Sequence, residues 1–151
     1  MTPEETPFPL VKGGTILVAV DESEYSERAL TAALSMAEAC ASPVVAVTVV
    51  ELYPESLEHA PDLEEKMAAE ARQLLAGVRE RAVQEGVECE TVVHTGPHPH
   101  EYIVREAQER GVALIVTGTH GRSGLRGLFM GSVAERVVGH APCAVLVVPS
   151  R

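Results

Sequence analysis

Four segments of the chain consist almost entirely of aliphatic residues, many of them β-branched. These segments are Thr15–Val20, Val44–Val50, Ala113–Val116 and Ala144–Val148. Strands that are apolar on both faces are typical of a parallel sheet covered by helices on both sides. A fifth segment, Val87–His94, is more polar, and we expect it to form an outer strand.

Between these segments, apolar residues recur at the spacing of helices. The pattern predicts four helices, over Ser23–Ala41, Asp62–Gly86, Pro99–Arg110 and Gly131–Gly139. In the second of them, Asp62 and Glu65 predict a capped start, and Gly86 predicts the end. The connection Glu51–Pro61 carries no clear pattern. Five strands alternating with four helices predict a doubly wound α/β sheet.

The length of 151 residues suits one domain. Residues 1–12 contain three prolines and two acids, so we expect a poorly ordered tail followed by a single domain over residues 13–151. The order of polar and apolar residues in that tail is wrong for a signal peptide. The apolar runs are too short to span a bilayer, so we expect no membrane partner.

Charge and composition narrow the classes of partner. The formal net charge is −10, and aromatic residues make up only 3% of the chain. These values argue against nucleic-acid binding through a basic face or an aromatic stacking platform. The three cysteines form no CxxC pair, which indicates a reduced, cytoplasmic chain.

The fourth apolar segment is followed by a glycine-rich stretch. Five glycines, the first being Gly118 and the last Gly131, fall within fourteen residues and precede a predicted helix. Glycine lets backbone N–H groups approach a ligand closely, and a helix N-terminus adds further unpaired N–H groups. Together with Arg122 and Arg126, this arrangement predicts a cradle for phosphates. The alternative is a flexible surface loop without a ligand.

Two better-known phosphate motifs are absent from the sequence. Asp21 and its neighbours follow the first strand, where a dinucleotide-binding fold would carry G-x-G-x-x-G. The segment Gly127–Ser132 has the wrong spacing for a Walker A motif and lacks its lysine. These absences argue against efficient phosphoryl transfer.

The glycine spacing resembles the motif G-2x-G-9x-G-[S/T] of nucleotide-binding universal stress proteins. In this sequence the motif is filled by Gly118, Gly121, Gly131 and Ser132. The segments VAVDES, Gly96-Pro97 and VAERVVGHAPCAVLVVP also resemble the family, so that the resemblance covers about residues 12–149. It implies a five-stranded sheet of order 3-2-1-4-5, in which the first and fourth strands are neighbours.

The same resemblance implies the ligand and its contacts. Asp21 would bind the nucleoside, although an Asp there can also cap the first helix. Val20 and Val49 would form the walls around adenine. The ribose and phosphates would be held by Gly118, Gly121, Gly131, Ser132 and the N–H of Val133, with Thr117 and Arg122 nearby. The ligand would be ATP, or AMP or ADP, with Mg²⁺ bridging the phosphates if ATP is bound.

We therefore expect a cytoplasmic, ATP-binding module that acts as a sensor in a stress response. The resemblance implies a homodimer formed through Ala144–Val148, an apolar strand expected at the sheet edge. One alternative is a slow ATPase or autophosphorylating enzyme that uses His120, Asp21 or Ser132 in the same site. The other is an interaction module that binds no nucleotide.

The remaining histidines and a serine are weaker candidates. The cluster of His94, His98 and His100 could hold zinc, but interleaved prolines and the missing further ligand favour solvated loop histidines. Ser123 does not lie in a G-x-S-x-G motif, so we expect no nucleophilic role for it.

Overall fold

The structure is a computed structural model that describes residues 13–121 and 130–149. The expected N-terminal tail and Arg122 therefore lie outside the described residues. The described chain forms one sheet of five parallel strands in the order β3-β2-β1-β4-β5, which confirms the predicted fold class and strand order. The strands are β1 (Ile16–Ala19), β2 (Val44–Glu51), β3 (Cys89–Gly96), β4 (Leu114–Gly118) and β5 (Ala144–Val148).

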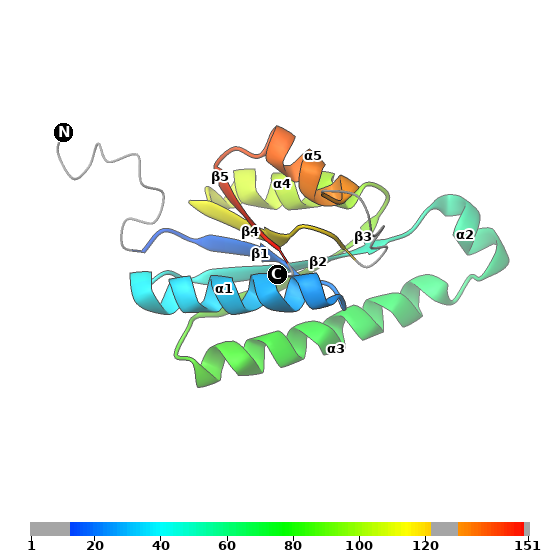
Figure 1. The fold of residues 1–151 in the computed structure, drawn as a ribbon. Coiled ribbons are helices and arrows are strands. Elements are labelled where there is room, and N and C mark those ends of the chain that lie inside the picture. Colours follow the sequence, from blue (N-terminus) through cyan, green and yellow to red (C-terminus); the bar gives the residue numbers. More distant parts are fainter. Residues whose placement is uncertain (1–12, 122–129, 150–151) are drawn as a thin grey trace.

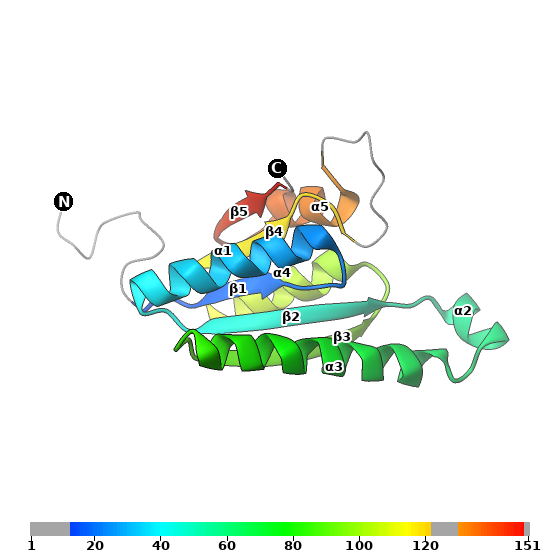
Figure 2. The ribbon, with the colours of Figure 1, turned by 60° about the horizontal axis from the view of Figure 1, so that its bottom comes forward.

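Helices cover both faces of this sheet. The helices are α1 (Glu24–Cys40), α2 (Pro54–His59), α3 (Leu63–Gln84), α4 (Pro99–Arg110) and α5 (Ser132–His140). Helices α1 and α3 lie on one face and α4 and α5 on the other, as Figures 1 and 2 show. The chain therefore crosses from one side of the sheet to the other between the two halves of the sequence.

Helix α2 is an addition to the four predicted helices. It has six residues, starts at Pro54 and buries none of its side chains. A helix this short and exposed needs no repeating apolar positions, so the pattern along the chain could not reveal it. Proline at its first position is favourable there because the missing N–H would have no helical partner.

Several predicted element boundaries differ from the structure by one or two residues. Strand β3 starts and ends two residues later than predicted, since the N–H of Val87 donates to Ala82 and belongs to the turn after α3. Strand β4 extends to Gly118. Asp62 precedes α3, but its backbone is already helical and its side chain makes no capping hydrogen bond, contrary to the prediction.

Alternating side chains of the strands build a core on each face. On the α1 and α3 side, Ile16 and Val18 pack with Leu34 in the larger cluster. On the α4 and α5 side, Leu17 and Ile115 pack in a second cluster. A third, small cluster of Val50, Leu52 and Ala71 lies at the carboxyl end of β2. Among the described residues, no helix is both long enough and apolar enough to cross a membrane.

Neighbouring strands β1 and β4 mark the point where the strand order reverses. The two strands are parallel and their register pairs Ile16 with Leu114, so their carboxyl ends lie at the same end of the sheet. After β1 the chain continues into α1 on one face, whereas after β4 it leads to α5 on the other. Ligands of open α/β sheets bind at such a point, beyond the carboxyl ends of the strands.

Candidate functional site

A cavity of about 460 Å³ lies at the carboxyl ends of β1, β2 and β4. This volume falls in the range of small-molecule pockets. Nine of the ten residues that the sequence predicted for the site line it, and the tenth, Arg122, lies outside the described residues. The nine are Val20, Asp21, Val49, Thr117, Gly118, Gly121, Gly131, Ser132 and Val133.

Asp21 is held in position by the start of α1. Its Oδ1 accepts a hydrogen bond from the N–H of Ser23 at 2.7 Å, and its own N–H donates to Ser26 Oγ at 2.8 Å. Ser23, whose side chain accepts from the N–H of Ser26, is the residue that caps α1. The alternative in which Asp21 caps this helix is therefore wrong.

The Asp21 carboxylate faces the glycine-rich segment. A Cβ added to Gly121 would lie 3.3 Å from Asp21 Oδ2. Residues a hundred positions apart in the sequence thus border the same cavity. A carboxylate in this place can accept hydrogen bonds from ligand hydroxyl groups.

Gly131, directly before α5, is hydrogen-bonded to the residue that follows β4. Its N–H donates to the carbonyl of Thr119 at 2.6 Å, and an added Cβ would lie 3.2 Å from both His120 Cα and the Thr119 oxygen. Gly131 and the backbone of Thr119 and His120 are therefore too close for a larger residue to fit at position 131 unless the backbone moves. This contact closes the base of the loop between β4 and α5.

The first turn of α5 contributes backbone donors to the cavity. Gly131 caps this helix without a side-chain hydrogen bond, and Ser132, Val133 and Ala134 line the cavity directly after it. The first N–H groups of a helix have no partner within the helix, and they carry the positive end of its dipole. Since the N–H of Gly131 is used by Thr119, the donors left for an anion come from the residues that follow it.

Gly118 has a packing role that the sequence did not reveal. An added Cβ would lie 2.7 Å from Tyr25 Cβ and 2.9 Å from the Tyr25 carbonyl carbon. The first turn of α1 therefore packs directly on the last residue of β4. The close approach of α1 to this strand explains why position 118 carries glycine, whether or not a ligand binds beside it.

Val20 and Val49 line the cavity from opposite faces of the sheet. The Val20 side chain belongs to the cluster under α1 and α3, whereas Val49 packs against the cluster under α4 and α5. The cavity therefore wraps around the end of the sheet. A planar ligand ring in contact with both Val20 and Val49 would have to lie across the carboxyl end of the sheet.

Sequence reasoning missed Thr48 and the contributions of two helices. The Thr48 side chain is buried, and its hydroxyl donates to the carbonyl of Val20 at 2.9 Å, which ties the ends of β1 and β2 together. A single threonine interrupting the run Val44–Val50 was the available signal. Further lining residues come from α3 (Met67, Glu70, Ala71 and Leu74) and α4 (Pro99 and Ile103).

The charges around the cavity are acidic. Asp21, Glu22, Glu51 and Glu70 line it, and none of its described lining residues is Lys or Arg. The described parts of the chain contain no group of three or more His, Cys, Asp or Glu side chains arranged to hold a metal ion. A polyanion in this cavity needs positive charge from a bound cation or from elsewhere in the chain.

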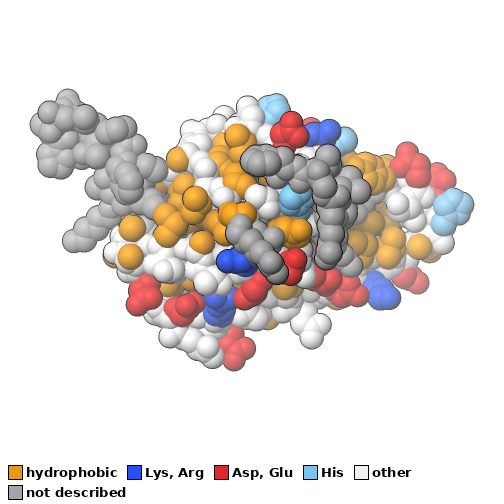
Figure 3. Space-filling view, viewed as in Figure 1, with side chains coloured by type: hydrophobic (Ala, Val, Ile, Leu, Met, Phe, Trp, Pro, Cys, Tyr) orange, Lys and Arg blue, Asp and Glu red, His pale blue; other side chains and the backbone are white. Residues whose placement is uncertain are grey.

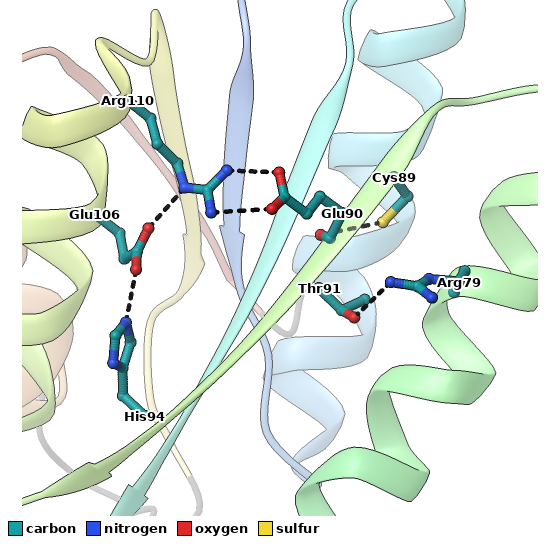
Figure 4. Close-up of polar contacts among 7 residues, drawn as sticks. All are labelled: Arg79, Cys89, Glu90, Thr91, His94, Glu106 and Arg110. Atoms are coloured by element: carbon teal, nitrogen blue, oxygen red, sulfur yellow. Dashed lines mark hydrogen bonds and ion pairs between the residues drawn. The ribbon is translucent and has the colours of Figure 1, made fainter.

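The prediction of solvated loop histidines was wrong for His94. This residue lies in β3, its Nε2 is 2.7 Å from Glu106 Oε1, and its ring stacks on Tyr102 at 5.2 Å between centroids. Figure 4 shows that Arg110 joins Glu106 of α4 to Glu90 of β3. Burial acts to raise the pKa of Glu106, but hydrogen bonds from Arg110 and His94 outweigh it, so that its pKa lies below the usual value. These residues join β3 to α4 and do not line the cavity.

Comparison with known families decides what kind of protein carries this cavity. The sequence model of the universal stress protein family matches residues 14–149. The chain belongs to the universal stress protein family. In this universal stress protein, the structure brings Gly118, Gly121, Gly131 and Ser132, the residues of the predicted glycine motif, to one cavity.

Curated relatives of this universal stress protein match nearly its whole length. Universal stress protein YxiE of Bacillus subtilis is 32% identical over 147 residues, covering 88% of this chain and 97% of the relative. Universal stress protein MJ0531 of Methanocaldococcus jannaschii is 35% identical over 137 residues, covering 88% of this chain and 80% of the relative.

Solved structures share the fold. Hypothetical protein MJ0577 superposes with a TM-score of 0.84 at 29% identity, covering 92% of this chain and 97% of the other. A universal stress protein from Archaeoglobus fulgidus, solved in complex with dAMP, has a TM-score of 0.67 at 27% identity, covering 91% and 98%. A universal stress protein solved in complex with cAMP has a TM-score of 0.69 at 25% identity, covering 93% and 99%.

Proposed function

We propose that this universal stress protein is a cytoplasmic sensing module that binds an adenine nucleotide, ATP in the first place, in a stress response. The observation that carries the proposal is the convergence of the Asp21 carboxylate and the start of α5 on one cavity. Such a site pairs an acceptor for sugar hydroxyls with donors for phosphate. The solved relatives with cAMP and dAMP support an adenine nucleotide as the ligand.

In this proposal each part of the nucleotide has its own surroundings. The ribose binds Asp21, and the phosphates bind the backbone of Gly121 and the first turn of α5 at Ser132 and Val133. The base lies across the end of the sheet, where Val20 and Val49 reach it from opposite faces. Thr117, Gly118 and Gly131 complete the walls, and Arg122 adds positive charge from the glycine-rich segment.

The acidic lining gives Mg²⁺ a physical role. Four carboxylates surround the cavity, so a triphosphate entering it alone would be repelled. Mg²⁺ bridging the phosphates neutralises part of their charge and is coordinated by phosphate oxygens and water. We expect ATP to bind more weakly when Mg²⁺ is removed with a chelator, and AMP to be affected less.

Calorimetric titration with Mg²⁺-ATP tests the proposal. The variant Gly131→Val should bind at least about 100-fold more weakly, because the added side chain meets the backbone of Thr119 and His120 and displaces the cradle. Gly139→Val within α5 is the control, since an added Cβ there meets nothing within 4 Å. Absence of binding by the unaltered protein, or unchanged affinity in Gly131→Val, would contradict the proposal.

We further propose a homodimer through β5. This strand is an edge of the sheet, and four of its five residues are only partly buried in the single chain. Val138 on the adjacent α5 is 49% exposed, and hydrophobic side chains gather in the middle of the face in Figure 3, where Figure 1 places β5. Edge strands with apolar side chains pair readily with another chain. Light scattering should give twice the mass of one chain, and the monomer mass at every concentration would refute the dimer.

A further inference from the structure

Part of the cavity, here called the second lobe, lies on the face of the sheet covered by α3. Along β2, Val47 and Val49 pack on the side of α4, whereas Val50 packs on the side of α3. All three line the cavity, as do residues of α3 and α4. Since these helices lie on opposite faces (Figures 1 and 2), the cavity passes around the end of β2 from one face to the other.

The lobe beside α3 is built from apolar side chains. Val50 and Ala71 are buried, with 5% and 6% of their surfaces exposed, and belong to the small cluster at the end of β2. Met67 packs against this cluster and Leu74 against the main core, and both line the cavity. Apolar walls of this kind are typical of pockets for small organic molecules.

The rim of this lobe is acidic. Glu51 at the end of β2 and Glu70 on α3 line the cavity together with the apolar residues. No described lining residue is Lys or Arg, so an anionic group in this lobe would have neither of these cations beside it. Carboxylates beside an apolar wall favour an apolar molecule that carries an ammonium group.

We infer that this lobe binds a small aromatic amine in its cationic form, separately from the nucleotide. The inference that the two ligands bind together rests on the proposed function, which places the nucleotide at β1, β4 and α5. In this arrangement the base contacts Val20 and Val49, and the second ligand occupies the part of the cavity between Val50 and α3. The aromatic ring packs against Met67 and Ala71, and the ammonium group faces Glu70.

Two probes with the same ring and opposite charge test this inference. Calorimetric titration with 1-naphthylmethylamine should show one saturable site, and 1-naphthylacetate should bind at least about tenfold more weakly. The amine should bind with unchanged affinity when the protein is saturated with Mg²⁺-ATP. Equal binding of both probes, binding of neither, or displacement of the amine by ATP would overturn the inference.

Variants locate the amine. Ala71→Trp should weaken amine binding at least about tenfold by filling the lobe, whereas Ala69→Trp, exposed on the same helix, should leave it unchanged. Glu70→Gln preserves the packing and should weaken amine binding about threefold while leaving 1-naphthylacetate no weaker. Unchanged amine affinity in both Ala71→Trp and Glu70→Gln would place the amine elsewhere and refute the site.

The same titrations separate the two proposals. If Gly131→Val lowers ATP affinity and leaves amine affinity unchanged, the two ligands occupy different parts of the cavity, as we infer. If the protein binds the amine but not ATP, the proposed function fails and the apolar lobe stands. If it binds ATP but not the amine, the second lobe has no such ligand and only this inference fails.

Discussion

The two ends of the sheet differ in how their backbone groups are used. At the amino end, the N–H groups of Ile16, Val44 and Ala113 donate at 2.8–2.9 Å to carbonyls just before the neighbouring strands, so the sheet hydrogen bonds continue beyond the strand ends. At the carboxyl end, the same strands open into a cavity of about 460 Å³. What distinguishes the carboxyl end is the start of α5, whose first N–H groups have no partner within the helix and lie beside the cavity.

Glycines show the same difference. At the amino end, Gly86 and Gly111 have φ of +71° and +59°, and an added Cβ would meet nothing within 4 Å. At the carboxyl end, Gly118 and Gly131 have no positive φ, but an added Cβ would overlap neighbouring backbone at Gly118 and crowd it at Gly131. Glycine therefore ends helices at one end of the sheet and permits close packing at the other.

The largest expected effect is that of Gly118→Val at the carboxyl end. The new side chain would overlap the backbone of Tyr25 in the first turn of α1, and backbone cannot turn away as a flexible side chain can. We expect the free energy of unfolding, measured in urea, to fall by about 3 kcal/mol. A variant that keeps its stability but loses ATP would show that this glycine serves the ligand and not the packing of α1.

A smaller effect is expected for Thr48→Val, also at the carboxyl end. The substitution keeps the shape of the side chain but leaves the buried carbonyl of Val20 without its hydroxyl donor. We expect the free energy of unfolding to fall by about 1–2 kcal/mol. ATP affinity should fall as well, because this bond holds the chain directly before Asp21. Thr31→Val is the control, since that hydroxyl is exposed on α1. Equal losses in both variants would contradict a special role for Thr48.

The smallest effect is expected at the amino end, for Gly111→Ala. Alanine fits the space but must adopt the left-handed conformation that ends α4, so the free energy of unfolding should fall by about 1 kcal/mol. ATP affinity should not change. Gly77→Ala within α3, where φ is not positive, should raise stability by about 0.5–1 kcal/mol. Loss of ATP affinity in Gly111→Ala would mean that the two ends of the sheet are coupled.

Much of the fold could be predicted from the sequence because its signals are local. A run such as Val44–Val50 is apolar at every position except Thr48, which is typical of a strand covered on both faces. The pattern of apolar residues does not reveal the strand order. That order was predicted from the resemblance of the glycine motif to that of universal stress proteins. Helix α2 escaped prediction because it is short and buries nothing.

The candidate site could be predicted in part for the same reason. Glycine spacing and the Asp after the first strand are visible along the chain, whereas the pairing of His94 with Glu106 depends on how β3 lies against α4. The reason for glycine at position 118 depends on where α1 packs.

The sequence by itself determined which segments become the five strands and the four longer helices, and it marked the glycines as a candidate phosphate site, while the resemblance to a family added Asp21 as a nucleoside contact. Only the tertiary structure decided that Val20 and Val49 lie on opposite faces, that Thr48 ties β1 to β2, and that α3 adds an apolar lobe. The physical reason is that hydrophobic periodicity depends on near neighbours in the chain. The shape and charge of a cavity depend on side chains that only the packing of distant elements brings together.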